Sequence, residues 1–313
     1  MLQYTIRRLL LIIPTMFFVA LITFVLAHAA PGSPFEKNEN RPLPQATIDR
    51  LNRLYDIDKP ITEQFVNFLG NAIRLDFGPS LVRDRAVTEI IGQGFPVSAQ
   101  LGAQALLLSL AISLPLGVVS ALRQNSAVDY GSLFFATIGY TIPSFVIGIV
   151  SIFVFAVWLR WLPIVGWTDS SGHADVRHMV LPTVILALGP AAVLTRITRA
   201  SMLEAIRQDY VRTARSKGLR EQVVVVGHVM KNAMIPVATI VGPVTAGLIT
   251  GSFIIERLFS IPGVGRLYLT SIEGRDYPVI MATTLLYAFL IMVANITVDL
   301  VYGVLDPRIK LAK

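Results

Sequence analysis

The chain has 313 residues, of which 54% are apolar and 15% are charged. Together with a mean hydropathy of +0.63, these values exclude an ordinary soluble domain and place the chain among membrane proteins. The net charge of +7 lies in short clusters between apolar runs. A nucleic-acid surface needs a continuous basic face with interleaved aromatic residues, so we expect no nucleic-acid partner. The chain contains no cysteine, which excludes disulfides, thiolate metal sites and cysteine nucleophiles.

Taken in chain order, six apolar stretches are each about long enough for the roughly 20 residues that cross a bilayer. They lie near residues 9–30, 97–121, 130–158, 179–200, 233–255 and 278–303. We therefore expect an all-α membrane protein with six transmembrane helices, embedded in a lipid bilayer. A single domain would cover residues 1–313.

The first stretch imitates a cleavable signal peptide, because Arg7 and Arg8 precede its apolar run and Ala27-His-Ala29 follows. Its run of about 22 residues exceeds the roughly 7 to 15 of a signal core, which favours a retained first span. Cleavage stays open as the alternative, since the remaining helices fit the same charge pattern.

Basic residues at the ends of the stretches predict the orientation, because Lys and Arg in short loops favour the cytosolic side. Arg7, Arg8, Arg123, the run 196–231 and the tail 308–313 would share that side. We expect a multi-pass protein of the cytoplasmic (inner) membrane with both termini cytosolic.

An extracytoplasmic insert is expected at residues 31–96, between the first two spans. Its start is rich in turn-forming residues, and two apolar sets at helical spacing follow. These sets are Ile48, Leu51, Leu54 and Tyr55, then Phe65, Phe68, Leu69 and Ile73. The pattern predicts a small helical cap, either a packing lid or a contact for a soluble partner.

A cytosolic loop at residues 201–232 contains a short self-contained helix between spans four and five. Asp209 can cap its first amides, Arg215 and Lys217 suit the negative end of the helix dipole, and Gly218 supplies a left-handed stop. Such a helix has little to do in the bilayer, so we expect it to present a surface to a partner. A basic interfacial helix lying on anionic lipid is the alternative.

The segment Tyr210-Val-Arg-Thr-Ala-Arg-Ser-Lys-Gly218 resembles the EAA loop of membrane subunits of ATP-binding-cassette (ABC) importers, which docks in a groove of the ATPase. Ala214 and Gly218 fit the general pattern, whereas Arg212 and Thr213 stand where Glu and Ala are usual. The resemblance assigns ATPase coupling to Asp209, Tyr210, Arg212, Thr213, Ala214, Arg215, Lys217 and Gly218.

Further strings occur in order along the whole chain and resemble the permeases of peptide and nickel importers. They are Ala30-Pro-Gly-Ser-Pro-Phe35, Asp58-Lys-Pro60, Asp76-Phe-Gly-Pro-Ser80, Ile142-Pro-Ser-Phe145, Phe259-Ser-Ile-Pro-Gly-Val-Gly265, Arg275-Asp-Tyr-Pro278 and Asp306-Pro-Arg308. The first and third of these, with Phe95-Pro-Val-Ser-Ala-Gln-Leu-Gly102 and Leu162-Pro-Ile-Val-Gly-Trp167, look most like the oligopeptide permease B-type subunit. Dipeptide, modified-peptide and nickel permeases are the alternatives.

This resemblance implies a type I importer permease fold and a set of partners. They would be a homologous second permease, two ABC ATPase subunits, an extracytoplasmic solute-binding protein and a peptide substrate. The chain itself would bind no cofactor, and ATP and Mg would be used by the ATPase subunits. The turn at 259–265 would dip back as an outer gate during alternating access.

Ionisable residues inside spans are functional candidates because they are costly there. Asp299 lies one turn after Asn295 on the same face, where it can pair with Arg196 or Arg199 of span four. Structural pairing, gate control and direct peptide contact are the possible roles of Asp299. Asn295 and Arg196 are further candidates for the gate or pathway.

The outer end of span five has two further features. Glu256 and Arg257 are expected to extend their charged ends to the membrane interface. Gly263 and Gly265 then predict a turn, because glycine permits backbone angles that other residues resist.

Enzymatic motifs are missing from the sequence. No lysine follows a glycine, so there is no phosphate-binding loop, and neither Gly-x-Ser-x-Gly nor His-Glu-x-x-His occurs. We expect a translocation subunit that is not itself an enzyme. An ion-coupled secondary transporter is the rival of another class, but proton coupling usually needs several buried carboxylates and only Asp299 fits.

Overall fold

The computed structural model describes residues 2–29, 59–168, 172–249 and 252–305. Regular structure in these ranges is helical, with no β-strand. The long helices are α1 (Leu2–Ala29), α4 (Val87–Leu122), α5 (Ala127–Thr141), α7 (Val176–Ile206), α10 (Met230–Ile249) and α13 (Tyr277–Leu305). The short ones are α3 (Ile61–Ile73), α6 (Ser144–Ser151), α8 (Asp209–Ser216), α9 (Glu221–Val223), α11 (Phe253–Leu258) and α12 (Val264–Gly274), with two π-helical segments, η1 (Ile152–Trp158) and η2 (Val224–Val229).

Among the described residues, five helical segments are long and apolar enough to cross a membrane, and one bent pair can supply a sixth span. The bent pair corrects the straight helix expected over 130–158, because α5 and the α6–η1 segment meet at 100°. Pro143 causes the break. It pushes Ile142 into an extended conformation with ψ of 124°, and a new helix starts after it.

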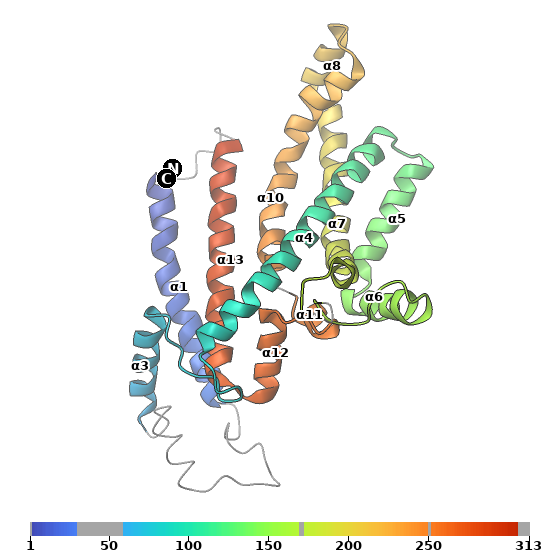
Figure 1. Ribbon diagram of the computed structural model, residues 1–313. Helices are drawn as coiled ribbons and strands as arrows, with labels where there is room; N and C mark the ends of the chain where they lie inside the picture. The colour runs from blue at the N-terminus through green and yellow to red at the C-terminus, as the bar shows by residue number, and fades with distance from the viewer. Residues whose placement is uncertain (1, 30–58, 169–171, 250–251, 306–313) are drawn as a thin grey trace.

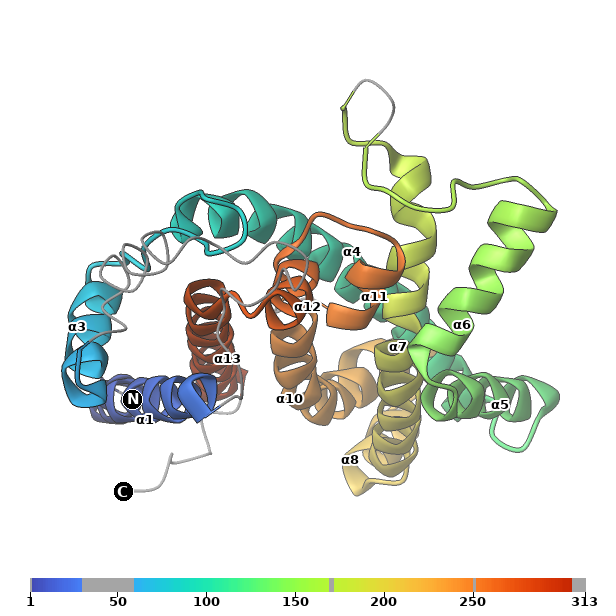
Figure 2. The same cartoon turned by 90° about the horizontal axis from the view of Figure 1, so that it is seen from below.

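The long helices pack as a row of neighbours that runs α1, α13, α10, α7, α5, and α4 crosses this row (Figures 1 and 2). Many of the α4 residues that are buried are small, and they recur every three or four residues. They are Ser98, Gly102, Ala105, Ser109, Ser113, Gly117 and Ser120. A side chain at Gly117 would overlap Thr198 of α7, so the small residues let the two backbones approach closely.

The second span is longer than expected, because α4 begins at Val87 rather than near residue 97. Its 36 residues give a length of about 54 Å, well beyond the hydrocarbon core of roughly 30 Å. The last part of the expected insert 31–96 therefore belongs to this helix.

The described part of the insert contains α3, which packs on α1 through the second predicted apolar set. The ring of Phe24 in α1 lies 5.2 Å from that of Phe65 and 6.1 Å from that of Phe68. Ile73 departs from the prediction, since it is 85% exposed. The first predicted set, residues 48–55, lies outside the described residues.

The bundle has two distinct ends (Figure 1). The first turns of α1, the last turns of α13 and the short helix α8 lie at one end, which we call the α8 end. Helices α3, α6, α11 and α12 lie toward the other, which we call the outer end.

Candidate functional site

Helix α8 has the boundaries that the sequence predicts, but its first residue does not cap it. Gln208 is the N-cap, and its side chain makes no capping hydrogen bond. Asp209 is the first helical residue; its side chain is 97% exposed and lies 3.8 Å from Arg212. A carboxylate in the first turn still suits the positive end of the helix. The capping role predicted for Asp209 is therefore wrong, although its charge is suitably placed.

The predicted stop of α8 is confirmed. Gly218 has φ of +76°, the left-handed conformation that glycine adopts without steric cost. Its amide donates to the carbonyl of Arg215 at 2.9 Å. The Arg215 guanidinium in turn donates two hydrogen bonds to Glu221, at 2.6 and 3.1 Å, and so fastens the end of α8 to the start of the next helix.

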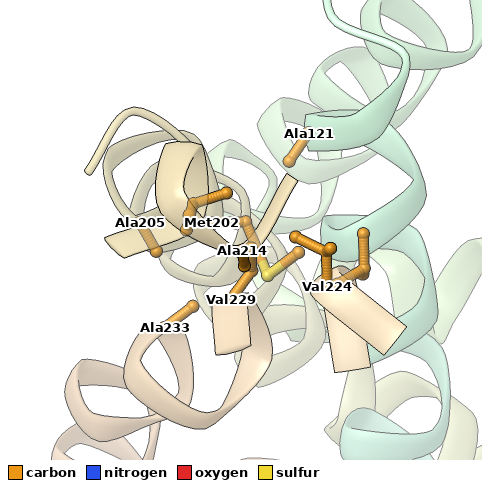
Figure 3. Packing of buried hydrophobic residues seen from close by; sticks show 9 residues of the cluster. Ala121, Met202, Ala205, Ala214, Val224, Val229 and Ala233 are labelled. Carbon is orange, nitrogen blue, oxygen red and sulfur yellow. The ribbon is translucent and has the colours of Figure 1, made fainter. Parts of the chain in front are cut away.

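One face of α8 is buried in the bundle (Figure 3). Val211 is fully buried and Ala214 is 5% exposed. They belong to an apolar cluster with residues of α4, α7, η2 and α10, namely Ala121, Met202, Ala205, Val224, Val225, Val229 and Ala233. Because this cluster joins α8 to the ends of several long helices, a displacement of α8 must move them too or break the packing.

The opposite face of α8 is exposed and polar. Tyr210, Arg212, Thr213 and Lys217 are all exposed, and the Arg212 side chain is 78% accessible. The small residue that fits the EAA pattern, Ala214, faces the bundle, where little space is available. Arg212 and Thr213, which depart from the pattern, lie on the exposed face.

A buried ion pair that sequence reasoning missed lies near the ends of α4, α5 and α7. Arg199 donates two hydrogen bonds to Asp129, at 2.6 and 2.7 Å, and Ser120 donates a third. Asp129 is 1% exposed. A local signal was present, because Ser126 and Asp129 have the spacing of a helix-start motif, and the Asp129 amide does bond the Ser126 hydroxyl at 3.3 Å.

The predicted pathway residues lie on two helices, α7 and α13. Asn295 is half-buried on α13, and Arg196 is exposed on α7. Asp299 belongs to α13, but its side chain lies outside the described residues. Asp129 holds the Arg199 guanidinium through two hydrogen bonds, and the pairing expected of Asp299 stays a prediction.

At the outer end, the structure contradicts the expected position of Glu256. Its side chain is fully buried rather than extended to the interface. It accepts hydrogen bonds from the Ser98 hydroxyl at 2.8 Å and the Arg266 amide at 3.1 Å. Ser98 in turn accepts from the Val264 amide at 2.9 Å. Arg257 does lie exposed as expected, and it pairs with Glu273 at 2.9 Å.

The reason expected for the glycines of the outer turn is also wrong. Gly263 has φ of −96°, and neither it nor Gly265 has a positive φ. A Cβ at Gly263 would instead overlap the Glu256 carboxylate and the Ser98 hydroxyl, and one at Gly265 would lie 3.0 Å from the carboxylate. These glycines therefore provide space for a buried acid.

A second buried carboxylate joins two of the sequence strings. Asp276 is 2% exposed and accepts hydrogen bonds from the Ser80 hydroxyl and from the Leu81 amide, the latter at 3.0 Å. The loop before α4 is thereby fixed to the corner between α12 and α13. This contact gives a structural role to Ser80 of the string 76–80 and to Asp276 of the string 275–278.

Two family models of known proteins match successive parts of this chain. Residues 1–102 match the family model of the N-terminal part of the binding-protein-dependent transport system membrane component. Residues 113–311 match the model described as the binding-protein-dependent transport system inner membrane component.

Two curated relatives are similar over their whole length. The chain is 42% identical to the dipeptide transport system permease protein DppB of Bacillus subtilis (strain 168), over 100% of this chain and 99% of that protein. It is 39% identical to the oligopeptide transport system permease protein OppB of Salmonella typhimurium (strain LT2), over 99% of this chain and 100% of that protein.

A solved structure of the MetNI methionine ABC transporter, in an inward-facing conformation, has the same fold. The TM-score is 0.56 at 16% identity, over 69% of this chain and 96% of that one. This likeness concerns the fold alone, and it confirms the expected ABC importer permease fold. Given a family model matched over 113–311 and relatives similar from end to end, the chain belongs to the family of binding-protein-dependent transport system inner membrane components.

Proposed function

We propose that this chain is the membrane-spanning permease subunit of an ATP-driven importer that translocates peptides across the cytoplasmic membrane. The observation that carries the proposal is the arrangement of α8. It buries Val211 and Ala214 in a cluster shared with several long helices and exposes a polar face. The named relatives are peptide transport permeases, which supports peptides as the substrate class.

The proposal includes the partners that such a subunit needs. A homologous second permease would complete the pathway, two ABC ATPase subunits would use ATP and Mg, and a solute-binding protein would deliver peptide from outside. The α8 end would be cytosolic. The first turns of α1 and the last turns of α13 lie at that end, so both termini would be cytosolic as well.

In this mechanism α8 is the coupling element. ATP binding would close the ATPase dimer. The exposed residues Arg212, Thr213 and Lys217 would contact the ATPase surface and move with it. Ala214 would pass the displacement to the cluster beneath it. Coupling can be only as large as the difference in contact free energy between the two states. An acidic groove on the ATPase would increase that difference.

The peptide length divides the proposal into two candidates. Four sequence strings favour an oligopeptide permease, whereas the identity to a dipeptide permease is 42% against 39% for an oligopeptide permease. We propose oligopeptides as the substrate and keep dipeptides as the second candidate. Asn295, Asp299 and Arg196 remain proposed gate or pathway residues in either case.

The test uses the complex purified with its partners from native membranes and reconstituted in liposomes. Uptake of labelled dialanine, trialanine and pentaalanine is measured with and without ATP and the binding protein. We expect ATP hydrolysis and uptake of the longer peptides to rise together when the binding protein is added. Uptake of dialanine alone would select the dipeptide candidate, and uptake that follows a proton gradient without ATP would refute an ABC importer.

A further inference from the structure

We propose that Glu256 and Ser98 form a latch, which holds the turn 259–265 closed against α4 and opens when the transporter opens toward its outer side. Glu256 is then a positioning residue for transport. This inference rests on the import function proposed above, and it adds a specific contact that controls one end of the pathway.

The latch connects three helices through one carboxylate. Glu256 lies on α11, the hydroxyl that it accepts from belongs to Ser98 of α4, and the amide of Arg266 belongs to the first turns of α12. Ser98 also accepts from the amide of Val264, so it bonds the acid and the helix start together. If Ser98 moves away, its hydrogen bonds to Glu256 and to the Val264 amide break together.

The donors to the Glu256 carboxylate, as far as the structure describes them, are a hydroxyl and backbone amides. The nearby Arg266 guanidinium donates to the carbonyl of Ser260 instead. Neutral dipoles stabilise a buried anion only while they stay aligned with it. When the turn moves away from α4, the Ser98 donor is lost and water can take its place. A contact of this kind is suited to opening and closing, because the carboxylate can be satisfied in both states.

Other contacts of the turn show that it lies packed against α4 in this structure. Phe259 and Ile261 are buried in an apolar cluster with residues of α4 and α7, and the Phe259 carbonyl accepts from the Gly166 amide at 2.8 Å. The backbone of α4 comes close at Gly94, where a Cβ would lie 3.3 Å from Gly263 and Val264. The turn is therefore packed on α4 on both sides of the latch.

A single cysteine can report the opening, because the chain has none of its own. Ser271 is 5% exposed and follows Leu267 by one turn of α12, on the same face. Leu267 packs against Val87 and Ile90 of α4. In Ser271→Cys, the thiol should therefore be protected while α12 lies on α4 and exposed when it moves away.

The experiment measures the rate of alkylation of Ser271→Cys by a membrane-impermeant maleimide, from the outer side, in the complete complex without nucleotide. We expect slow labelling in the parent. Adding Glu256→Gln, which keeps the shape of the side chain and removes its charge, should raise the rate about tenfold, the factor for one charge-assisted hydrogen bond. Ser98→Ala should raise it in the same direction. The matched control is Glu273→Gln, which removes a carboxylate of α12 that is 60% exposed, and it should leave the rate unchanged.

Unchanged labelling in correctly inserted Glu256→Gln and Ser98→Ala would overturn the latch, and so would fast labelling of the parent. If Glu256→Gln fails to insert, Ser98→Ala decides, because it removes only one oxygen. A merely structural role would lower the melting temperature without exposing the thiol. Labelling requires neither peptide nor ATP, so it tests the latch separately. Failure of the parent to take up any of the three alanine peptides with ATP and the binding protein would refute the import function and leave the labelling result standing.

Discussion

At the scale of single residues, Gly218 offers a test of the backbone alone. No heavy atom lies within 4 Å of the position that its Cβ would occupy, so a substitution acts through φ and not through a clash. A side chain in this left-handed conformation costs about 1 to 2 kcal/mol. We expect Gly218→Val to reduce ATP-driven uptake several-fold, with a normal amount of protein in the membrane.

The control for this prediction is Gly172→Val, in the loop before α7. Gly172 has φ of +81° and open space around it, so it carries a similar backbone penalty far from α8. We expect normal uptake for that variant. If uptake is normal in Gly218→Val as well, the end of α8 has no part in coupling.

The buried ion pair between Asp129 and Arg199 predicts a stability effect. Breaking the pair leaves the Arg199 charge, whose side chain is 20% exposed, without its carboxylate. The cost should reach at most about 3 kcal/mol, the lower bound for a fully buried pair. Asp129→Asn should therefore lower the melting temperature of the protein in detergent. Arg199→Lys should lower it too, because a lysine cannot reproduce the two parallel hydrogen bonds.

Glu63→Gln is the matched comparison for Asp129→Asn. Its carboxylate pairs with Lys59 at 3.2 Å, but the side chain is 52% exposed, and exposed pairs contribute little. An equal loss of stability in Glu63→Gln and Asp129→Asn would show that burial of the Asp129 pair is not what matters.

At the scale of helices, α8 is fixed by a tight fit rather than by many polar bonds. Ala214→Leu adds volume where Ala214 is 5% exposed, and overpacking a filled site costs about 1 to 3 kcal/mol. We expect α8 to be displaced, so that less ATPase co-purifies with the complex and uptake falls. The measurement is the ratio of ATPase to permease after purification.

Ala86→Leu makes the same substitution at an exposed residue just before α4, far along the chain from α8, and should leave that ratio unchanged. Equal losses in both variants would indicate a general effect of the added leucine, and would remove the argument from the buried cluster.

For the whole molecule, the two ends of the bundle predict its orientation in the membrane. Arg220 follows α8 and Arg74 follows α3, and both are exposed. A thiol in Arg220→Cys should react with an impermeant reagent only from the cytosolic side, and one in Arg74→Cys only from the outer side. The opposite pattern would place α8 outside, where no ATPase can contact it.

The sequence by itself determined the composition class, most of the spans and the end of α8. Long apolar runs can be satisfied in a bilayer only as helices, because every backbone polar group must then be bonded within the segment. The helix stop at Gly218 could be predicted because glycine, which has no side chain, adopts the left-handed conformation without steric cost. These features are local, so neighbouring residues in the chain suffice to specify them.

Only the tertiary structure decided the features that depend on residues distant in sequence. Glu256 was expected at the membrane interface, because nothing near it in the chain indicates that Ser98 and the amides of α12 enclose it. The partner of Arg199 and the contact between Ser80 and Asp276 escaped prediction for the same reason. A carboxylate can be buried only where hydrogen-bond donors surround it. Here other helices supply those donors, and the packing of the helices decides where they lie.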